Sequence, residues 1–133
     1  MNTFIVDLKN KPGELAKVTE AIAQKGIDIT AFSGSTCGDS GSLALVTNDE
    51  AGTGRVLSEG QWKFHAIELV ETSLANRPGS LAEVTRRLAN AGVNIEAAFP
   101  TGMSGNNVQV AFATDNPAKA KQAVAELVGA STR

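Results

Sequence analysis

The sequence contains one cysteine, one histidine, one tryptophan and no tyrosine among its 133 residues. A single cysteine, Cys37, excludes an internal disulfide, and a lone histidine, His65, has no partner for a metal site or a catalytic triad. No apolar run approaches the roughly 20 residues needed to span a bilayer, and the N-terminal MNTFIVDLKN has no signal-peptide pattern. We therefore expect a cytoplasmic protein without a metal, a cofactor or a membrane partner.

Positive charge is also scarce. The formal net charge is −2, the sequence pI is about 5.4, and the longest run of basic residues is the pair Arg86 and Arg87. A surface that follows nucleic-acid phosphates needs more basic residues than this, so we expect no nucleic-acid partner. The sequence contains no recognisable carboxylate pair, nucleophile–base pair or metal-ligand cluster, so we do not expect an enzyme.

The sequence instead contains a duplication. The stretch NKPGEL at residues 10–15 returns as NRPGSL at residues 76–81, at an offset of 76 − 10 = 66 residues. Without a gap, residues 10–29 match residues 76–95 at ten positions: Asn10, Pro12, Gly13, Leu15, Ala16, Val18, Thr19, Ala23, Gly26 and Ile29. Such self-similarity predicts two copies of one unit, at 1–67 and 68–133. Units this small have thin cores, so we expect them to pack against each other or against another chain.

Each copy has the same pattern of predicted elements. An alternating apolar strand precedes the repeated turn, and a helix follows it with apolar residues at i, i+3 and i+7, which are Leu15, Val18 and Ile22 in the first copy. Next come a strand, a Gly/Ser/Asn-rich turn at 33–42 or 101–107, and another strand at 43–47 or 108–114. A last helix is clear in the second copy, where it should end near Val128, and is weakened in the first by two glycines. The pattern predicts an α+β fold with a split β-α-β plan.

The junction between the copies contains no flexible linker. Residues 62–74 lack Gly, Pro and Asn, and their apolar alternation changes phase, which predicts a bend or bulge near Ala66 to Glu68 within one strand. After Val128 only GASTR remains, which is too short and polar for a strand. We expect the second copy to lack its last strand and to leave one sheet edge open.

The repeated turn is a candidate anion site. A helix that begins at Pro-Gly leaves its first N–H groups unpaired at the positive end of the helix dipole, where a carboxylate is stabilised. Asn10 or Asn76 adds an amide beside this entrance, and Asp28 or Asn94 opens the second strand. Donors for a carboxylate and acceptors for an ammonium together favour an α-amino acid as the ligand. Asp28 would pair with an ammonium better than Asn94, which favours the first copy.

The strand, the [Asn/Asp]-x-Pro-Gly-x-Leu turn, the helix and the Gly-[Ile/Val]-[Asp/Asn]-Ile strand resemble the ACT domain, a small ligand-binding module of amino-acid metabolism. The resemblance covers both halves and implies tandem ferredoxin-like βαββαβ domains, with helices on one face of antiparallel sheets that join edge to edge and an amino acid bound at the domain interface. It also implies a set of ligand-binding positions, which are Asn10, Pro12, Gly13, Leu15, Asp28 and Ile29 in the first copy and Asn76, Pro78, Gly79, Leu81, Asn94 and Ile95 in the second.

Two functions remain open. The first is an amino-acid-binding regulatory or sensor protein that works as a homodimer or higher oligomer and can act on a partner enzyme. The second is a structural or interaction module without a ligand that oligomerises or docks on a partner enzyme through its sheet edge. A purely architectural role of Pro-Gly, which turns the chain and starts a helix, is compatible with the second.

Overall fold

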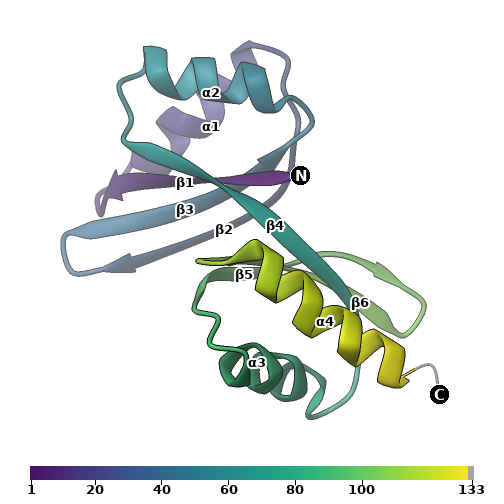
Figure 1. Ribbon diagram of the computed structural model, residues 1–133. Helices are drawn as coiled ribbons and strands as arrows, with labels where there is room; N and C mark the ends of the chain where they lie inside the picture. Colours follow the sequence, from purple (N-terminus) through teal and green to yellow (C-terminus); the bar gives the residue numbers. More distant parts are fainter. Residues whose placement is uncertain (132–133) are drawn as a thin grey trace. The chain divides into compact units, whose positions relative to one another are not determined.

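The computed structural model describes residues 1–131, with side-chain positions through residue 125, and forms two compact units, Met1–Ile67 and Glu68–Arg133 (Figure 1). Unit 1 denotes the first and unit 2 the second. No helix within the described part of the chain has the length and hydropathy needed to cross a membrane.

Unit 1 contains an antiparallel sheet in the order β2-β3-β1. Beside β1, the Asp7 N–H donates to the carbonyl of Lys63 at 2.9 Å, just before β4 begins. The elements are β1 (Asn2–Lys9), α1 (Glu14–Gln24), β2 (Ile29–Cys37), β3 (Ser40–Thr47), α2 (Glu50–Glu59) and the first residues of β4 (Phe64–Ala75). Both helices lie on one side of these strands (Figure 1).

Unit 2 repeats the plan with the antiparallel order β4-β6-β5. Its elements are the remainder of β4, then α3 (Ser80–Asn90), β5 (Ile95–Ser104), β6 (Asn107–Thr114) and α4 (Pro117–Ser131). The expected α+β, ferredoxin-like fold class is therefore confirmed. The last helix runs to Ser131, further than the expected end near Val128, and no strand follows it within residues 1–131.

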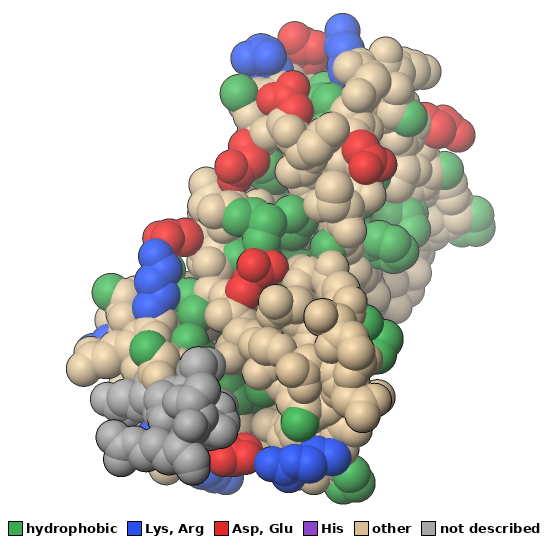
Figure 2. Space-filling view, turned by 90° about the vertical axis from the view of Figure 1, so that its right-hand side faces the viewer, with side chains coloured by type: hydrophobic (Ala, Val, Ile, Leu, Met, Phe, Trp, Pro, Cys, Tyr) green, Lys and Arg blue, Asp and Glu red, His purple; other side chains and the backbone are tan. Residues whose placement is uncertain are grey.

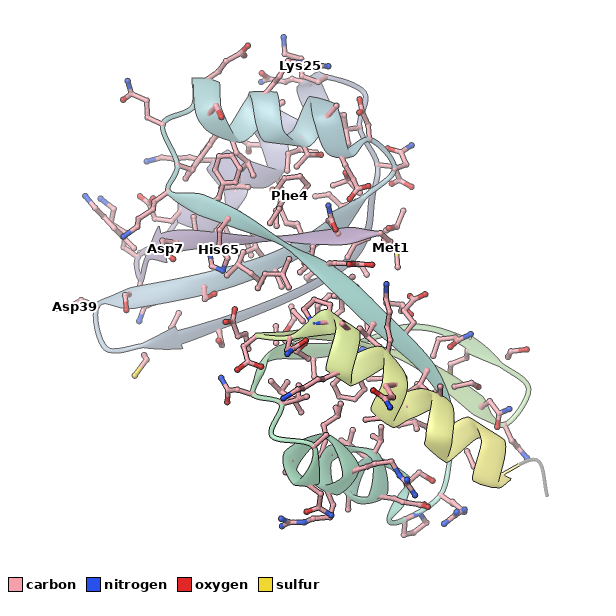
Figure 3. The ribbon with its side chains drawn as sticks, viewed as in Figure 1. Met1, Phe4, Asp7, Lys25, Asp39 and His65 are labelled. Atoms are coloured by element: carbon pink, nitrogen blue, oxygen red, sulfur yellow. The ribbon has the colours of Figure 1, made fainter. Side chains whose placement is uncertain are left out.

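The core of each unit lies between the helices and one face of the strands. In unit 1, Phe4 and Val6 of β1 stand directly opposite Leu45 and Leu43 of β3 and pack, with other buried residues, against Val18 and Ile22 of α1. Phe4 lies between the sheet and the helices (Figure 3). The apolar period of α1 therefore does bury one face, but only from its second turn onward, since Leu15 is 48% exposed.

Helix α2 forms in spite of its two glycines because polar contacts fix its start. The Asp49 side chain accepts a hydrogen bond from the Gly52 N–H at 2.9 Å, and the buried Thr53 hydroxyl lies 2.8 Å from the Asp49 carbonyl and 2.7 Å from the Thr47 hydroxyl. A side chain at Gly52 would bring its Cβ within 2.3 Å of an Asp49 carboxylate oxygen. The Asp49 carboxylate approaches Gly52 so closely that only glycine fits there, which explains one of the two glycines that weakened the helix prediction.

The two predicted Gly/Ser/Asn-rich turns are much shorter than expected. Strand β2 continues to Cys37 and β3 begins at Ser40, so only Gly38 and Asp39 turn the chain, and β5 and β6 are joined by two residues in the same way. Gly38 has a φ of +61°, which glycine adopts without strain. Ser35 pairs with Ser42 in this part of the ladder, where side chains are exposed, so small polar residues form strand here.

The two copies join within one strand, as expected, and the bend or bulge near Ala66 to Glu68 stays a prediction, since the described pairing of β4 begins at Leu69. Strand β4 runs from Phe64 to Ala75, and its pairing with β6 is regular from Leu69 to Ala75. The apolar pattern changes phase in the sequence because Leu69 and Val70 are both buried, on opposite faces of β4.

Thr72 supplies a test of the unit 2 core. Its hydroxyl is buried and makes no hydrogen bond among the described residues, and Val6 holds the corresponding position in unit 1. Because an unpaired buried hydroxyl loses its hydration without compensation, we expect Thr72→Val to stabilise the protein by about 1 kcal/mol. Urea unfolding measures the change. The reciprocal Val6→Thr should destabilise by a similar amount or more, and a loss of stability in Thr72→Val would contradict this account.

Candidate functional site: the cleft at the start of α1

The repeated Pro-Gly pair forms a tight turn at the start of α1. The Glu14 N–H points to the Lys11 carbonyl at 3.4 Å, and Gly13, the third residue of the turn, has a φ of +88°. Proline at the second position and a left-handed glycine at the third define a type II turn. Unit 2 repeats it, with the Ser80 N–H 3.4 Å from the Arg77 carbonyl and a φ of +92° at Gly79.

This turn leaves the first N–H groups of the helix available. Gly13 has no side chain to cap α1, and its carbonyl accepts from the Lys17 N–H at 3.0 Å. The N–H groups of Leu15 and Ala16 find no backbone or side-chain acceptor among the described residues. Two unpaired donors at the positive end of an 11-residue helix make a seat for an anion.

Glu14 is the one carboxylate in this first turn. It pairs with Lys17 at 3.3 Å and with Lys11 at 3.6 Å. The hydrogen bond from Lys17, the largest cause, together with the charges of both lysines, lowers the pKa of Glu14 below its ordinary value of 4.5. Glu14 is thus held as an anion between two lysines, which offset its repulsion of a second carboxylate at the helix start.

A cleft of about 420 Å³ opens beside the turn. Leu8, Leu15, Phe32 and Leu43 supply apolar walls, and Gly34 leaves one part of the strand surface bare. The polar lining comes from Lys9, Asn10, Lys11, Glu14, Ser35, Thr36, Gly41 and Ser42. The cleft therefore joins an anion seat to an apolar surface.

Asn10 braces this cleft. Its side-chain Nδ2 donates to the Gly38 carbonyl at 2.9 Å, and its backbone N–H donates to the Asp39 carbonyl at 2.9 Å. Asp39 lies at the tip of the β2–β3 hairpin (Figure 3). Asn10 therefore fixes the hairpin against the turn, and its amide oxygen, which accepts no bond among the described residues, is left for a ligand.

Asp28 lies away from this cleft within unit 1. It follows the C-terminal end of α1, where its N–H donates to the Asn48 side chain at 2.9 Å. Lys25, three residues earlier, lies at the far end of the unit from Asp39 (Figure 3). The sequence analysis grouped Asn10 with Asp28, but the two residues do not meet within one unit. Asn10 precedes the start of α1, and Asp28 follows its end.

The other positions implied by the resemblance lie in equivalent places. Pro12 and Pro78 are exposed in the turns, and Leu81, like Leu15, is about half exposed. Ile29 and Ile95 pack against the cores of their units. The Asn94 N–H donates to the Asp115 side chain at 2.9 Å, as the Asp28 N–H does to Asn48. The Asn76 N–H donates to the Asn106 carbonyl at 2.7 Å, as the Asn10 N–H does to Asp39.

Phe32 and Gly34 are two of the cleft residues that the sequence pattern did not identify. Phe32 is 66% exposed, and Gly34 lies within β2. The signal was available in the sequence as an aromatic residue two positions before a glycine within a strand, but the overlong predicted turn hid Gly34.

A larger hollow of about 650 Å³ lies between α3 and α4 in unit 2, bordered by Arg86, Arg87, Lys119 and Glu83. Glu83 in its lining also pairs with Arg77 of the unit 2 turn at 3.9 Å, and its charged lining is of mixed sign. Charged side chains of both signs are also interspersed over the face in Figure 2. Among the described residues, no three His, Cys, Asp or Glu side chains are grouped to hold a metal ion.

The duplicated βαββα plan and its Pro-Gly helix entrances define a pair of small α+β modules of one design. The family model described as ACT domain pair matches residues 1–127, so the chain belongs to this family. ACT domains are regulatory modules, and the resemblance noted from the repeated motif is therefore confirmed. No curated protein matches the sequence.

Solved structures share the fold over nearly the whole chain. A protein from Bacteroides thetaiotaomicron has a TM-score of 0.78 and 27% identity, covering 94% of this chain and 86% of its own. The regulatory subunit of aspartate kinase from Thermus thermophilus, in its ligand-free form, has a TM-score of 0.63 and 20% identity, covering 94% and 90%. The corresponding subunit from Thermus flavus has a TM-score of 0.61 and 22% identity, covering 94% and 91%.

The contact between Asn10 and the hairpin predicts a difference between the two copies. Asn10→Ala removes the bond to the Gly38 carbonyl, so we expect a loss of about 0.5–1 kcal/mol in the free energy of unfolding and faster amide exchange around Gly38. Urea titration and hydrogen exchange measure these changes. Asn76→Ala is the matched control and should cost less, since the Asn76 side chain makes no such bond among the described residues. Equal losses in both variants would contradict the assigned role.

Proposed function

We propose that this chain is a regulatory module that binds an amino acid at the unit 1 cleft. The observation that carries the proposal is an open cleft of about 420 Å³ placed against the uncapped first turn of α1. The ligand carboxylate would accept from the N–H groups of Leu15 and Ala16, where the helix dipole favours negative charge. The amide oxygen of Asn10 would accept from the ligand ammonium.

A second copy of the chain completes this site in our proposal. Strand β2 pairs only with β3 among the described residues, which leaves its other edge free. Phe32 on this strand and Leu15 beside it are large, exposed apolar residues. Unpaired edges with apolar neighbours associate readily, so pairing of β2 with β2 of a second chain would bury both features.

Antiparallel pairing of two β2 strands also gives Asp28 a role. In such a pair, the start of one strand lies beside the end of the other. Asp28 of the second chain would then approach the cleft of the first, and its carboxylate would pair with the ligand ammonium. The separation of Asn10 and Asp28 within one unit therefore favours a site shared by two chains.

Regulation follows from differential affinity. A ligand that contacts two chains binds the dimer better than the monomer, so it shifts the population of assembly states. Regulatory subunits of aspartate kinase share this fold. We propose by analogy that the assembly state of this chain acts on a partner enzyme of amino-acid metabolism.

A thermal-shift screen of the full chain against the twenty amino acids tests the proposal. We expect at least one amino acid to raise the melting temperature saturably, by roughly 5–10 °C at a hundredfold excess over its Kd, because binding to the folded state stabilises it. The amide of the same amino acid, which lacks the carboxylate, is the chemical control and should give little shift. An equal shift with the amide would contradict the carboxylate seat.

A panel without any stabilising amino acid would overturn the ligand-binding function and leave the interaction module. Sedimentation of Phe32→Asp and Met103→Asp then tests the β2 edge. The two side chains are equally exposed, at 66%, on different strands. Loss of the dimer only in Phe32→Asp would establish β2 as a docking edge without a ligand.

A further inference from the structure

Gly34 is a glycine that the fold itself does not require. It lies within β2, its φ is outside the left-handed region, and a Cβ added there would meet Leu43 Cδ1 at 3.7 Å and the Ser42 carbonyl at 3.9 Å. These are ordinary van der Waals distances. Glycine weakens a strand interior, and where the backbone does not need it, it often marks the close approach of a ligand.

The surface around Gly34 is apolar. Gly34 stands directly opposite Leu43 and Phe32 opposite Leu45, so all four residues share the helix-facing side of the sheet. Leu8 and Leu15 complete the lining on the α1 side. Phe32 and Leu15 remain 66% and 48% exposed, so a ligand that covered them would remove apolar surface from water.

The charged groups of the cleft gather at its other end. Lys9, Lys11 and Glu14 come from the end of β1 and the turn into α1, where the carboxylate and ammonium of an amino acid would lie. The polar side chain on the same face of β2 as Gly34 is that of the uncharged Thr36. A charged ligand side chain would lose its hydration there without an opposite charge.

Unit 2 has different residues at the positions equivalent to Phe32 and Gly34. Ala98 stands opposite Phe112 as Phe32 stands opposite Leu45, and Pro100 stands opposite Val110 as Gly34 stands opposite Leu43. The aromatic wall is therefore missing, and a proline ring occupies the position that glycine leaves bare. The Ser80 hydroxyl at this helix start is buried and without a partner among the described residues, whereas Glu14 is partly exposed.

From this contrast we infer that the unit 1 cleft selects an amino acid with an uncharged apolar side chain, which lies over Gly34 between Phe32 and Leu15, and that unit 2 holds no equivalent site. The inference rests on the proposed function and deepens it. The bare strand surface at Gly34 sets the ligand class, and the replacement by Pro100 removes that surface from the second copy.

Calorimetric titration of the full chain tests the inference. Leucine, isoleucine, valine, methionine and phenylalanine form one ligand set, and serine, threonine, lysine and aspartate form the other. We expect the tightest ligand to come from the apolar set and to bind at least tenfold more tightly than any member of the polar set. We expect one ligand per chain.

Substitutions then locate the side-chain pocket. Gly34→Val should weaken binding of the best ligand at least tenfold, and Gly34→Ala should weaken it less, with circular dichroism confirming that both variants fold. Pro100→Val is the matched control at the equivalent position of unit 2 and should leave binding unchanged. Valine favours strands, and a Cβ at Gly34 meets its neighbours at ordinary van der Waals distances, so folding should be retained.

The outcomes separate this inference from the function on which it rests. Tightest binding of a polar or charged amino acid would overturn the apolar selectivity while retaining the amino-acid-binding function. Equal effects of the Gly34 and Pro100 variants, or two ligands per chain, would overturn the assignment to unit 1. Absence of binding by every amino acid would overturn both.

Discussion

Each unit depends on a left-handed glycine at the start of its first helix. Gly13, with a φ of +88°, turns the chain from β1 into α1 in the space of one type II turn, so the helix begins beside the strand it packs against. A side chain in this conformation costs about 1–2 kcal/mol. The same residue cannot cap the helix with a side chain, so the turn that builds the fold also leaves donors exposed. Fold and anion seat are therefore two consequences of one backbone constraint.

The duplication made most of the fold predictable. Residues that recur in register, such as Val18 and Val84, are fully buried in their units because periodic apolar positions report the core directly. The hairpin lengths were not predictable, because small polar residues such as Ser35 and Ser42 are typical of turns but also suit exposed strand ends. The phase change at the junction has a related cause, since Leu69 and Val70 are buried on opposite faces of β4 and blur the alternation.

The candidate site was predictable only in part. The Pro-Gly entrance follows from sequence, since proline and glycine restrict the backbone wherever they occur. The exposure of Leu15 does not follow from sequence. Its helical spacing predicts a core position, whereas the residue is 48% exposed in the fold. The distance from Asp28 to Asn10 was not predictable either. The sequence indicates that Asp28 precedes a strand, but this distance depends on the path of α1 and β2. The two copies keep the turn and differ in the strand beside it, at Phe32 and Gly34, so we propose that the turn serves the fold in both copies and a ligand in one.

The central claim is that the start of α1 and the adjacent β2 surface form the ligand site, and amide chemical-shift mapping tests it most directly. During titration with the best amino acid of the thermal-shift screen, the account predicts the largest shifts at Leu15, Ala16 and Gly34, with saturation at a single affinity. Small shifts should occur at the matching amides of unit 2, which are those of Leu81, Ala82 and Thr101. Thr101 stands in for Pro100, because proline has no amide N–H. Largest shifts between α3 and α4, around Arg86 and Lys119, or equal shifts at both turns, would contradict it.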